Sequence, residues 1–179
     1  ANGNYSAPNE LENKIDALVT HWENIYGKDL ANKTIGDRFC YVLAKAEEKT
    51  GHKAVVLIDE YDKPLLDPLG EEQELINREV LRGFYGTFKS ADPYLRFVLL
   101  TGVTKFAQIT VFSGFNQAND LTMDSKYDAI CGITEEELYT VFAEPIKQMA
   151  DKFKITPDEM KLKLKKRYDG YHFSGDLLD

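Results

Sequence analysis

Residues 54–58, with the sequence Ala-Val-Val-Leu-Ile, form a short unbroken apolar run that is rich in β-branched side chains. Such a run is typical of a strand that is buried on both faces, and strands of this kind belong to parallel sheets flanked by helices. A second apolar run, residues 95–101, ends at Gly102. Because helical patterns alternate with these runs, the sequence predicts an α/β fold with a parallel sheet.

Three helical patterns accompany the two strands. Apolar residues recur at steps of three and four in residues 9–27, 34–51 and 71–89. This period predicts amphipathic helices that each bury one face. Thr34, with Asp37 three residues later, is expected to cap the second of these helices.

The second half of the chain has a different pattern. Residues 103–126 contain many turn formers and are expected to be a loop with room for one short helix, and a weak third strand is predicted at residues 128–132. Capping boxes at Thr134 and Thr156 predict two more helices, and Pro145 is expected to kink the first of them.

Composition and charge narrow the functional classes. The chain has 179 residues, of which 43% are hydrophobic, and 30 acidic against 22 basic residues give a formal charge of −8. Such a chain should form one globular domain and repel a phosphate backbone, so nucleic-acid binding would need a local patch. No apolar run approaches the roughly 20 residues of a membrane span. Cys40 and Cys131 lie in apolar segments and are expected to be buried free thiols, which predicts a reducing, cytoplasmic setting.

The adjacent carboxylates of Asp59 and Glu60 form the strongest chemical pattern. They follow the first predicted strand directly, at the end where ligands bind in open α/β sheets. This is the pattern of a Walker B segment, in which the first acid holds Mg²⁺ and the second orients or deprotonates the attacking water of phosphoryl transfer. The alternative is that the two acids only end a strand and begin a loop.

Two further residues lie near this end of the predicted sheet. If the second strand lies beside the first, Thr101 presents its hydroxyl next to Asp59 and Glu60, in the place of a polar sensor of the γ-phosphate. Lys105 is the nearest cation on that face. The alternatives are that Thr101 is a turn residue and that Lys105 is solvated.

The 179 residues contain no phosphate-binding loop. Such a loop needs glycines and a Gly-Lys-Ser/Thr sequence at the start of a helix. The one Gly-Lys pair, Gly27 and Lys28, is followed by Asp29 and lies at the end of a predicted helix. The basic run from Lys161 to Arg167 could contact phosphates, but cations in a last helical turn also complement the helix dipole.

Five sequence blocks occur in order along the chain: residues 56–64, 81–85, 96–106, 132–138 and 168–173. Together they resemble the bacterial AAA-ATPase-like family. In full-length members a P-loop segment precedes this region, and a PD-(D/E)xK nuclease-like domain commonly follows it. The resemblance therefore implies an incomplete P-loop NTPase-type sheet, flanked by helices and lacking the P-loop strand. Residues 1–179 would be one partial domain, with an α/β core at 1–133 and a helical part at 134–179.

The resemblance also implies a role for each matched residue. Asp59 would be the magnesium-binding acid, Glu60 the catalytic base and Thr101 a sensor, while Arg82 would contact a phosphate or a partner. The intact protein would use Mg²⁺ and ATP, with the upstream P-loop segment and the downstream nuclease-like domain as partners and nucleic acid reached only through a partner domain. Because the groups that grip the triphosphate are missing, the isolated chain is expected to be inactive and to hold no cofactor. The alternative is a non-catalytic interaction module that keeps the NTPase architecture.

The missing strand has a structural consequence. In P-loop proteins of this type it would lie between the strand ending at Thr101 and the later one near residues 128–132. The edge of residues 95–101 is therefore expected to be covered, since an open edge promotes pairing with other chains. The three candidates are a second copy of the chain in a homo-oligomer, residues 1–8, or the loop of residues 103–126.

Overall fold

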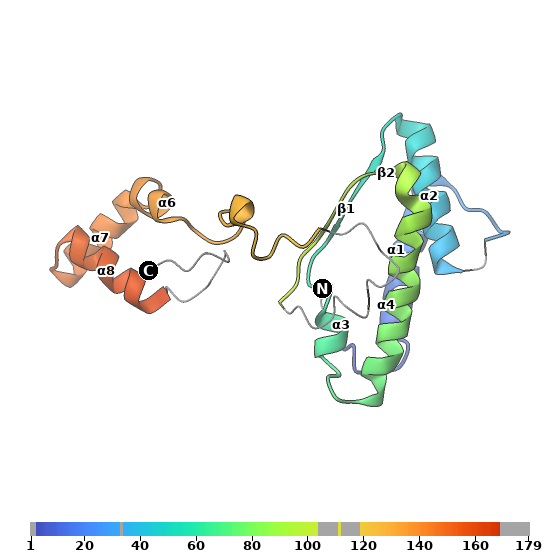
Figure 1. The fold of residues 1–179 in the computed structure, drawn as a ribbon, viewed down its shortest axis with the longest axis horizontal. Helices are drawn as coiled ribbons and strands as arrows, with labels where there is room; N and C mark the ends of the chain where they lie inside the picture. Colours follow the sequence, from blue (N-terminus) through green and yellow to red (C-terminus); the bar gives the residue numbers. More distant parts are fainter. Residues whose placement is uncertain (1–2, 33, 104–110, 112–118, 169–179) are drawn as a thin grey trace. The chain divides into compact units, whose positions relative to one another are not determined.

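The computed structural model describes residues 3–32, 34–103, 111 and 119–168. The chain divides into two compact units, Ala1–Ala118 and Asn119–Asp179, and both strands belong to the first (Figure 1). The sequence instead places the end of the α/β core at residue 133, and the domain organisation stays a prediction. Within the described ranges, no helix combines the length and the apolar character needed to cross a membrane.

In the described residues, the first unit contains a two-stranded parallel sheet. Strands β1 (Ala54–Ile58) and β2 (Leu95–Leu100) pair in parallel, with Val55 opposite Phe97 and Ile58 opposite Leu100. This pairing confirms the predicted mixed α/β architecture. Within the described residues β2 pairs with β1 alone. One predicted cover for the other edge of β2 is the loop of residues 103–126. Much of this loop, residues 104–110 and 112–118, lies outside the described residues.

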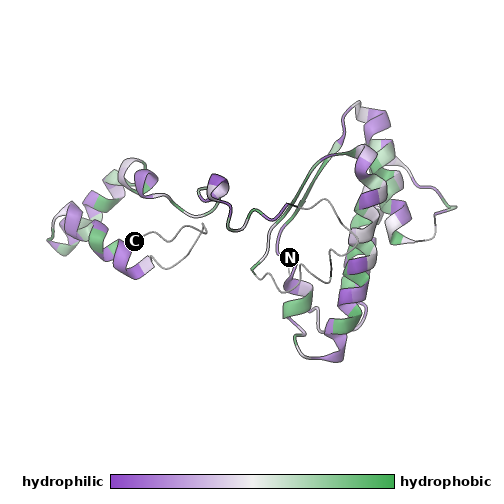
Figure 2. Cartoon of the chain, viewed as in Figure 1, coloured by the Kyte–Doolittle hydropathy of each residue, from purple (hydrophilic) through white to green (hydrophobic). Residues whose placement is uncertain are grey.

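Helices accompany the sheet at the positions that the apolar period predicts. They are α1 (Glu10–Tyr26), α2 (Ile35–Thr50), the short α3 (Lys63–Leu66), α4 (Glu72–Ala91) and the 3₁₀ turn η1 (Asp92–Tyr94). Figure 2 shows hydrophobic and hydrophilic residues alternating along these helices. The backbone N–H of Asp37 donates to the Thr34 hydroxyl at 3.1 Å, so the predicted cap of α2 forms.

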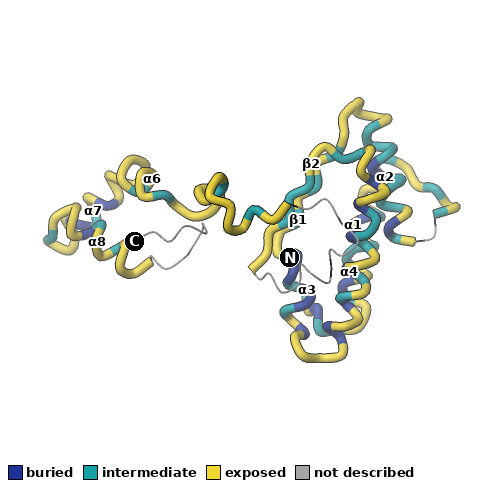
Figure 3. The backbone as a smooth tube through the Cα atoms, in the orientation of Figure 1, coloured by how far each residue is buried: buried dark blue, intermediate teal, exposed yellow. Residues whose placement is uncertain are grey.

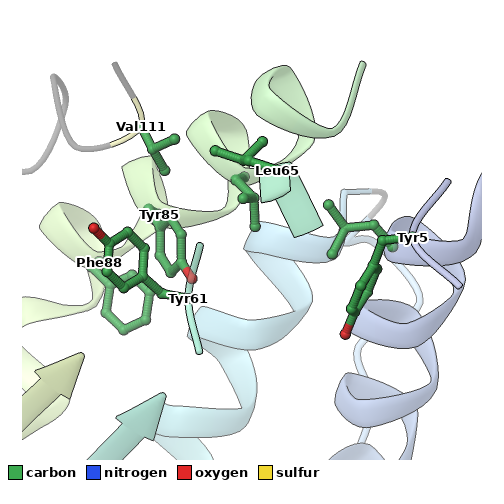
Figure 4. Packing of buried hydrophobic residues seen from close by; sticks show 8 residues of the cluster. Tyr5, Tyr61, Leu65, Tyr85, Phe88 and Val111 are labelled. Atoms are coloured by element: carbon green, nitrogen blue, oxygen red, sulfur yellow. The ribbon is translucent and has the colours of Figure 1, made fainter. Parts of the chain in front are cut away.

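The core of the first unit lies between one face of the sheet and the helices. Tyr61, Leu65, Tyr85 and Phe88 are at its centre, and Figure 4 shows how their side chains gather with those of Tyr5 and Val111. The strand residues that pack against this cluster are Val56, Ile58, Leu95, Val98 and Leu100. The helices therefore cover the face of the sheet that these residues share.

The other face of the sheet is apolar and open. Val55, Leu57 and Phe97 are 56%, 69% and 51% exposed. Figure 3 shows both strands coloured as intermediate and exposed. Strand residues alternate between faces, and the described helices cover one face only. The expectation that β1 is buried on both faces is therefore wrong for the described residues.

The second unit is helical. Its elements are η2 (Ser125–Tyr127), α6 (Glu135–Thr140), α7 (Ala143–Phe153) and α8 (Pro157–Tyr168). The capping box at Thr134 forms as predicted, since its hydroxyl accepts from the Glu137 N–H at 3.2 Å and the Glu137 carboxylate accepts from its N–H at 2.8 Å. A small core of Ile146, Ala150 and Met160 joins α7 to α8.

Three predictions for this part of the chain are corrected. The weak strand at residues 128–132 does not form, because the segment consists of turns and bends. Pro145 does not kink a single helix, because two separate helices, α6 and α7, form in its place. Pro145 lies in the first turn of α7, where its missing N–H costs no helical hydrogen bond. Cys131, in the same turn region, is exposed, and Cys40 in the first unit is only partly buried.

Candidate functional site

The segments that follow the two strands lie against each other. The N–H of Thr101 donates to the Ile58 carbonyl at 2.9 Å, and the N–H of Tyr61 donates to the Thr101 carbonyl at 3.0 Å. These bonds continue the parallel pairing past the end of the sheet. Asp59 and Thr101 therefore emerge side by side, and the Thr101 hydroxyl donates a hydrogen bond to Asp59 Oδ1.

Asp59 combines exposure with two donors on one oxygen. Its Oδ1 accepts from the Thr101 hydroxyl and from the N–H of Glu60, the latter at 3.0 Å. Both Asp59 and Thr101 are exposed. A carboxylate and a hydroxyl are hard oxygen donors, which Mg²⁺ prefers, and Mg²⁺ commonly takes only one or two carboxylates while water and phosphate complete its shell. These two side chains fit such an ion. Among the described residues, no group of three or more His, Cys, Asp and Glu side chains is arranged so that it could hold a metal ion.

Glu60 adopts an unusual backbone conformation. Its φ is 55°, in the left-handed region that is costly for residues with a side chain. Its carboxylate lies 3.7 Å from Lys63 Nζ, with the Glu60 side chain 47% exposed. Glu60 thus turns the chain away from β1 and directs its carboxylate towards the start of α3.

Asp62 is the buried acid of this segment, and the sequence offered no signal for it. It is 1% exposed, and its Oδ2 accepts from the N–H of Val103 at 2.9 Å. Its backbone carbonyl accepts from the N–H groups of Leu65 and Leu66, which open α3. Asp62 therefore connects the segment after β1 both to α3 and to the segment after β2.

Gly102 makes the close approach of the two segments possible. A Cβ atom at this position would lie 2.4 Å from Cε1 of the Tyr61 ring and 2.9 Å from Asp62 Oδ1. Tyr61 is part of the core and is 5% exposed. Since Cβ atoms essentially never approach other atoms this closely, only glycine fits without a shift of its neighbours.

The other two predicted site residues are Arg82 and Lys105. Arg82 lies on α4, where its Nη1 is 3.0 Å from Glu79 Oε1 and its side chain is 44% exposed. Exposed pairs of this kind contribute only about 0–1 kcal/mol to stability. Lys105 lies outside the described residues. The structure thus brings together Asp59 and Thr101, places Glu60 beside them, and shows Arg82 in a surface ion pair.

Comparison with known proteins identifies the family. A family model described as predicted AAA-ATPase matches residues 1–112. The chain belongs to this AAA-ATPase-like family. A curated relative from Azotobacter chroococcum mcd 1, described as an uncharacterized protein in the vnfD 5' region, is 35% identical over 172 residues. The match covers 94% of this chain and 31% of the relative, so the chain spans about a third of that protein. No solved structure matches.

Proposed function

We propose that this AAA-ATPase-like chain is part of a P-loop NTPase-type domain that binds and hydrolyses ATP with Mg²⁺. The observation that carries the proposal is the hydrogen bond from Thr101 to Asp59 at the carboxyl ends of two neighbouring parallel strands. Open α/β sheets bind their ligands at this edge. Family membership supports the same assignment.

Each site residue has a distinct proposed role. Asp59 holds the magnesium ion through water, and Thr101 fixes the orientation of its carboxylate and senses the γ-phosphate. The bound ion would offset the charge of the phosphates. Glu60 orients the attacking water and accepts its proton, for which its carboxylate must leave Lys63. Because that ion pair is half-exposed and 3.7 Å long, its loss should cost at most about 1 kcal/mol.

The open face of the sheet supports the proposal that residues 1–179 are part of a larger domain. Parallel sheets are almost always covered on both faces, yet Val55, Leu57 and Phe97 are exposed. In the proposed domain an upstream P-loop segment supplies the missing strand at the edge of the sheet, the cover of the open face and the groups that bind the triphosphate. Arg82 and Lys105 are proposed phosphate or partner contacts, and a downstream nuclease-like domain is the proposed partner through which nucleic acid is reached.

The same open face favours one alternative function. An exposed apolar surface of this kind is also typical of a surface for protein binding. A chain that keeps the architecture of an NTPase without nucleotide chemistry would then be an interaction module. The two functions differ in whether a P-loop precedes Ala1 in the polypeptide.

Calorimetry with Mg·ATP separates the two functions. We expect the isolated chain of residues 1–179 to show no binding in the micromolar range, because acidic side chains alone repel a triphosphate. A polypeptide in which a P-loop segment precedes these residues should bind Mg·ATP and hydrolyse it, and Asp59→Asn should weaken its Mg²⁺ dependence. Failure of that longer polypeptide to bind would favour the interaction module. Micromolar binding by the isolated chain would show that the triphosphate site lies within it.

A further inference from the structure

We infer that Asp62 is a positioning residue, whose buried carboxylate holds the segment after β2 so that the Thr101 hydroxyl stays on Asp59. The consequence for catalysis rests on the proposed function, whereas the positioning itself is a property of residues 1–179. Asp62 is 1% exposed, so it lies away from the surface on which a nucleotide would bind. It is therefore expected to act through Thr101 and not on the reacting atoms.

Besides the bond from Thr101 to Asp59 itself, three described hydrogen bonds join the two segments, and one of these three depends on a side chain. Thr101 bonds with its N–H to Ile58 and with its carbonyl to Tyr61, both through the backbone. The third bond runs from the N–H of Val103 to Asp62 Oδ2 at 2.9 Å. It fixes the chain two residues beyond Thr101, so that Thr101 is held on both sides.

The close packing of Gly102 restricts the movement of the chain between these hydrogen bonds. Tyr61 and Asp62 approach Gly102 so closely that a methyl group there would overlap both side chains. With Val103 bonded and Gly102 packed against a core tyrosine, Thr101 has little freedom to shift along the strand direction. Its hydroxyl is thereby held near Asp59.

Hydrogen bonds to α3, which is in turn bonded to α4, hold Asp62 in place. Its carbonyl accepts from Leu65 and Leu66 at 2.9 and 3.0 Å, which ties it to α3. Asn77 on α4, 1% exposed, donates from Nδ2 to the Pro64 carbonyl at 2.8 Å and so holds α3 in place. The position of the Thr101 hydroxyl is thus set by buried contacts that reach back to α4.

This role requires an acceptor at residue 62 but not a negative charge. In Asp62→Asn the amide oxygen can still accept from the Val103 N–H, whereas in Asp62→Ala the N–H loses its partner. Positioning therefore predicts that asparagine rescues most of what alanine loses. A role for Asp62 as a metal ligand or proton acceptor predicts that both variants are equally damaging.

Amide hydrogen exchange by NMR on residues 1–179 tests the positioning directly. In Asp62→Ala the amides of Thr101 and Val103 should exchange at least about tenfold faster, the equivalent of one lost hydrogen bond. In Asp62→Asn they should remain within about threefold of the wild type. The amides of β1 should not change in either variant. Asp67→Asn, which alters an exposed aspartate at the end of α3, is the matched control and should change neither amide.

Gly102→Ala is a second, independent variant, in case Asp62→Ala does not fold. Its new Cβ should push apart the same contact and speed exchange at Thr101 and Val103. Gly83→Ala is its control, because a Cβ at Gly83 meets nothing within 4 Å. Unchanged exchange at Thr101 in folded Asp62→Ala or Gly102→Ala would overturn the inference. So would an Asp62→Asn variant as perturbed as Asp62→Ala.

Kinetics of the ATP-hydrolysing polypeptide give the second readout. Asp62→Ala should lower kcat while KM for ATP changes less than about twofold, since the lost contact orients the hydroxyl and does not bind the nucleotide. Adding Thr101→Val to it should cause no further loss, because both changes remove the same hydroxyl from Asp59. Losses that multiply would show that Asp62 acts independently of Thr101. If the polypeptide hydrolyses no ATP, the proposed function fails, and the exchange rates still decide the role of Asp62.

Discussion

The ion pair between α1 and α2 gives a quantitative test of how the first unit is held together. Glu23 on α1 is buried, with its side chain 2% exposed, and Arg38 on α2 grips both of its carboxylate oxygens. Arg38 donates from Nε at 2.9 Å and from Nη2 at 2.8 Å. The guanidinium also donates to the Thr20 hydroxyl at 2.8 Å and to Asp16. Arg38→Met keeps the apolar stem and removes all of these donors.

The expected cost follows from what Arg38→Met leaves behind. Glu23 remains as a buried carboxylate, and Lys28, with its Nζ at 3.9 Å and its side chain half-exposed, remains as its weaker ion-pair partner. Removing one partner of a deeply buried pair costs about 3–5 kcal/mol. We expect about 2–3 kcal/mol here, because the pair lies between two helices of a small unit and Asp16 is 49% exposed. The double variant Glu23→Leu with Arg38→Met should recover most of this, since no buried charge remains.

Urea unfolding followed by the fluorescence of Trp22 measures these differences. Trp22 is the one tryptophan of the chain, lies on α1 beside Glu23 and stacks on Tyr26 at 6.1 Å, so it reports on the first unit. A cost below about 1 kcal/mol for Arg38→Met would show that the pair behaves like an exposed one. If the double variant is less stable than Arg38→Met, the loss of stability comes from losing the pair itself and not from leaving the Glu23 carboxylate without Arg38.

The remaining predictions concern pH and backbone geometry. The hydrogen bonds and charge of Arg38 hold the pKa of Glu23 below its usual value of 4.5. The pair therefore stabilises the fold above pH 4.5 and loses its contribution as the pH falls through the pKa of the folded state. The urea midpoint should fall more steeply below pH 4.5 in the wild type than in Arg38→Met. Gly36→Ala should lower the free energy of unfolding by about 1–3 kcal/mol, because its Cβ would lie 2.2 Å from a methyl carbon of α4. Gly83→Ala should raise the free energy of unfolding by up to about 1 kcal/mol, because its Cβ meets nothing within 4 Å. Equal effects of the two variants in urea unfolding would refute this. Glu60→Gly should be about 1 kcal/mol more stable than Glu60→Gln, because glycine accepts a φ of 55° without strain, and equal stabilities would show that the turn is unstrained.

Periodicity and composition predict the framework of the first unit because local pattern and tertiary packing agree there. The apolar run of β1 and the second run at β2 pair in parallel as predicted, and the helical period places α1, α2 and α4. The prediction of a third strand is wrong because local pattern and tertiary packing do not agree there. Residues 128–132 have some strand propensity but no paired strand in the described structure, and propensity alone does not hold a strand.

The candidate site was predicted only where residues follow a strand directly. Asp59 and Thr101 meet because each is the first residue beyond a paired strand, which a sequence can indicate. The burial of Asp62 and the close packing of Gly102 depend on how two loops meet, and no period or spacing encodes this contact. The open face of the sheet was also missed, because an apolar run indicates which residues need cover but not whether this stretch of chain supplies it.

The most direct test of the proposed ATPase is the turnover of Glu60→Gln in the polypeptide that contains a P-loop ahead of residues 1–179. Glutamine keeps the shape of the side chain but cannot take a proton, so ATP hydrolysis should fall by roughly 10²–10⁴ while Mg·ATP binding is retained. Glu72→Gln, the same change at an exposed position in the first turn of α4, should hydrolyse ATP at the wild-type rate. Wild-type turnover in Glu60→Gln would remove Glu60 from the mechanism and contradict the assignment of this strand end as the site of hydrolysis.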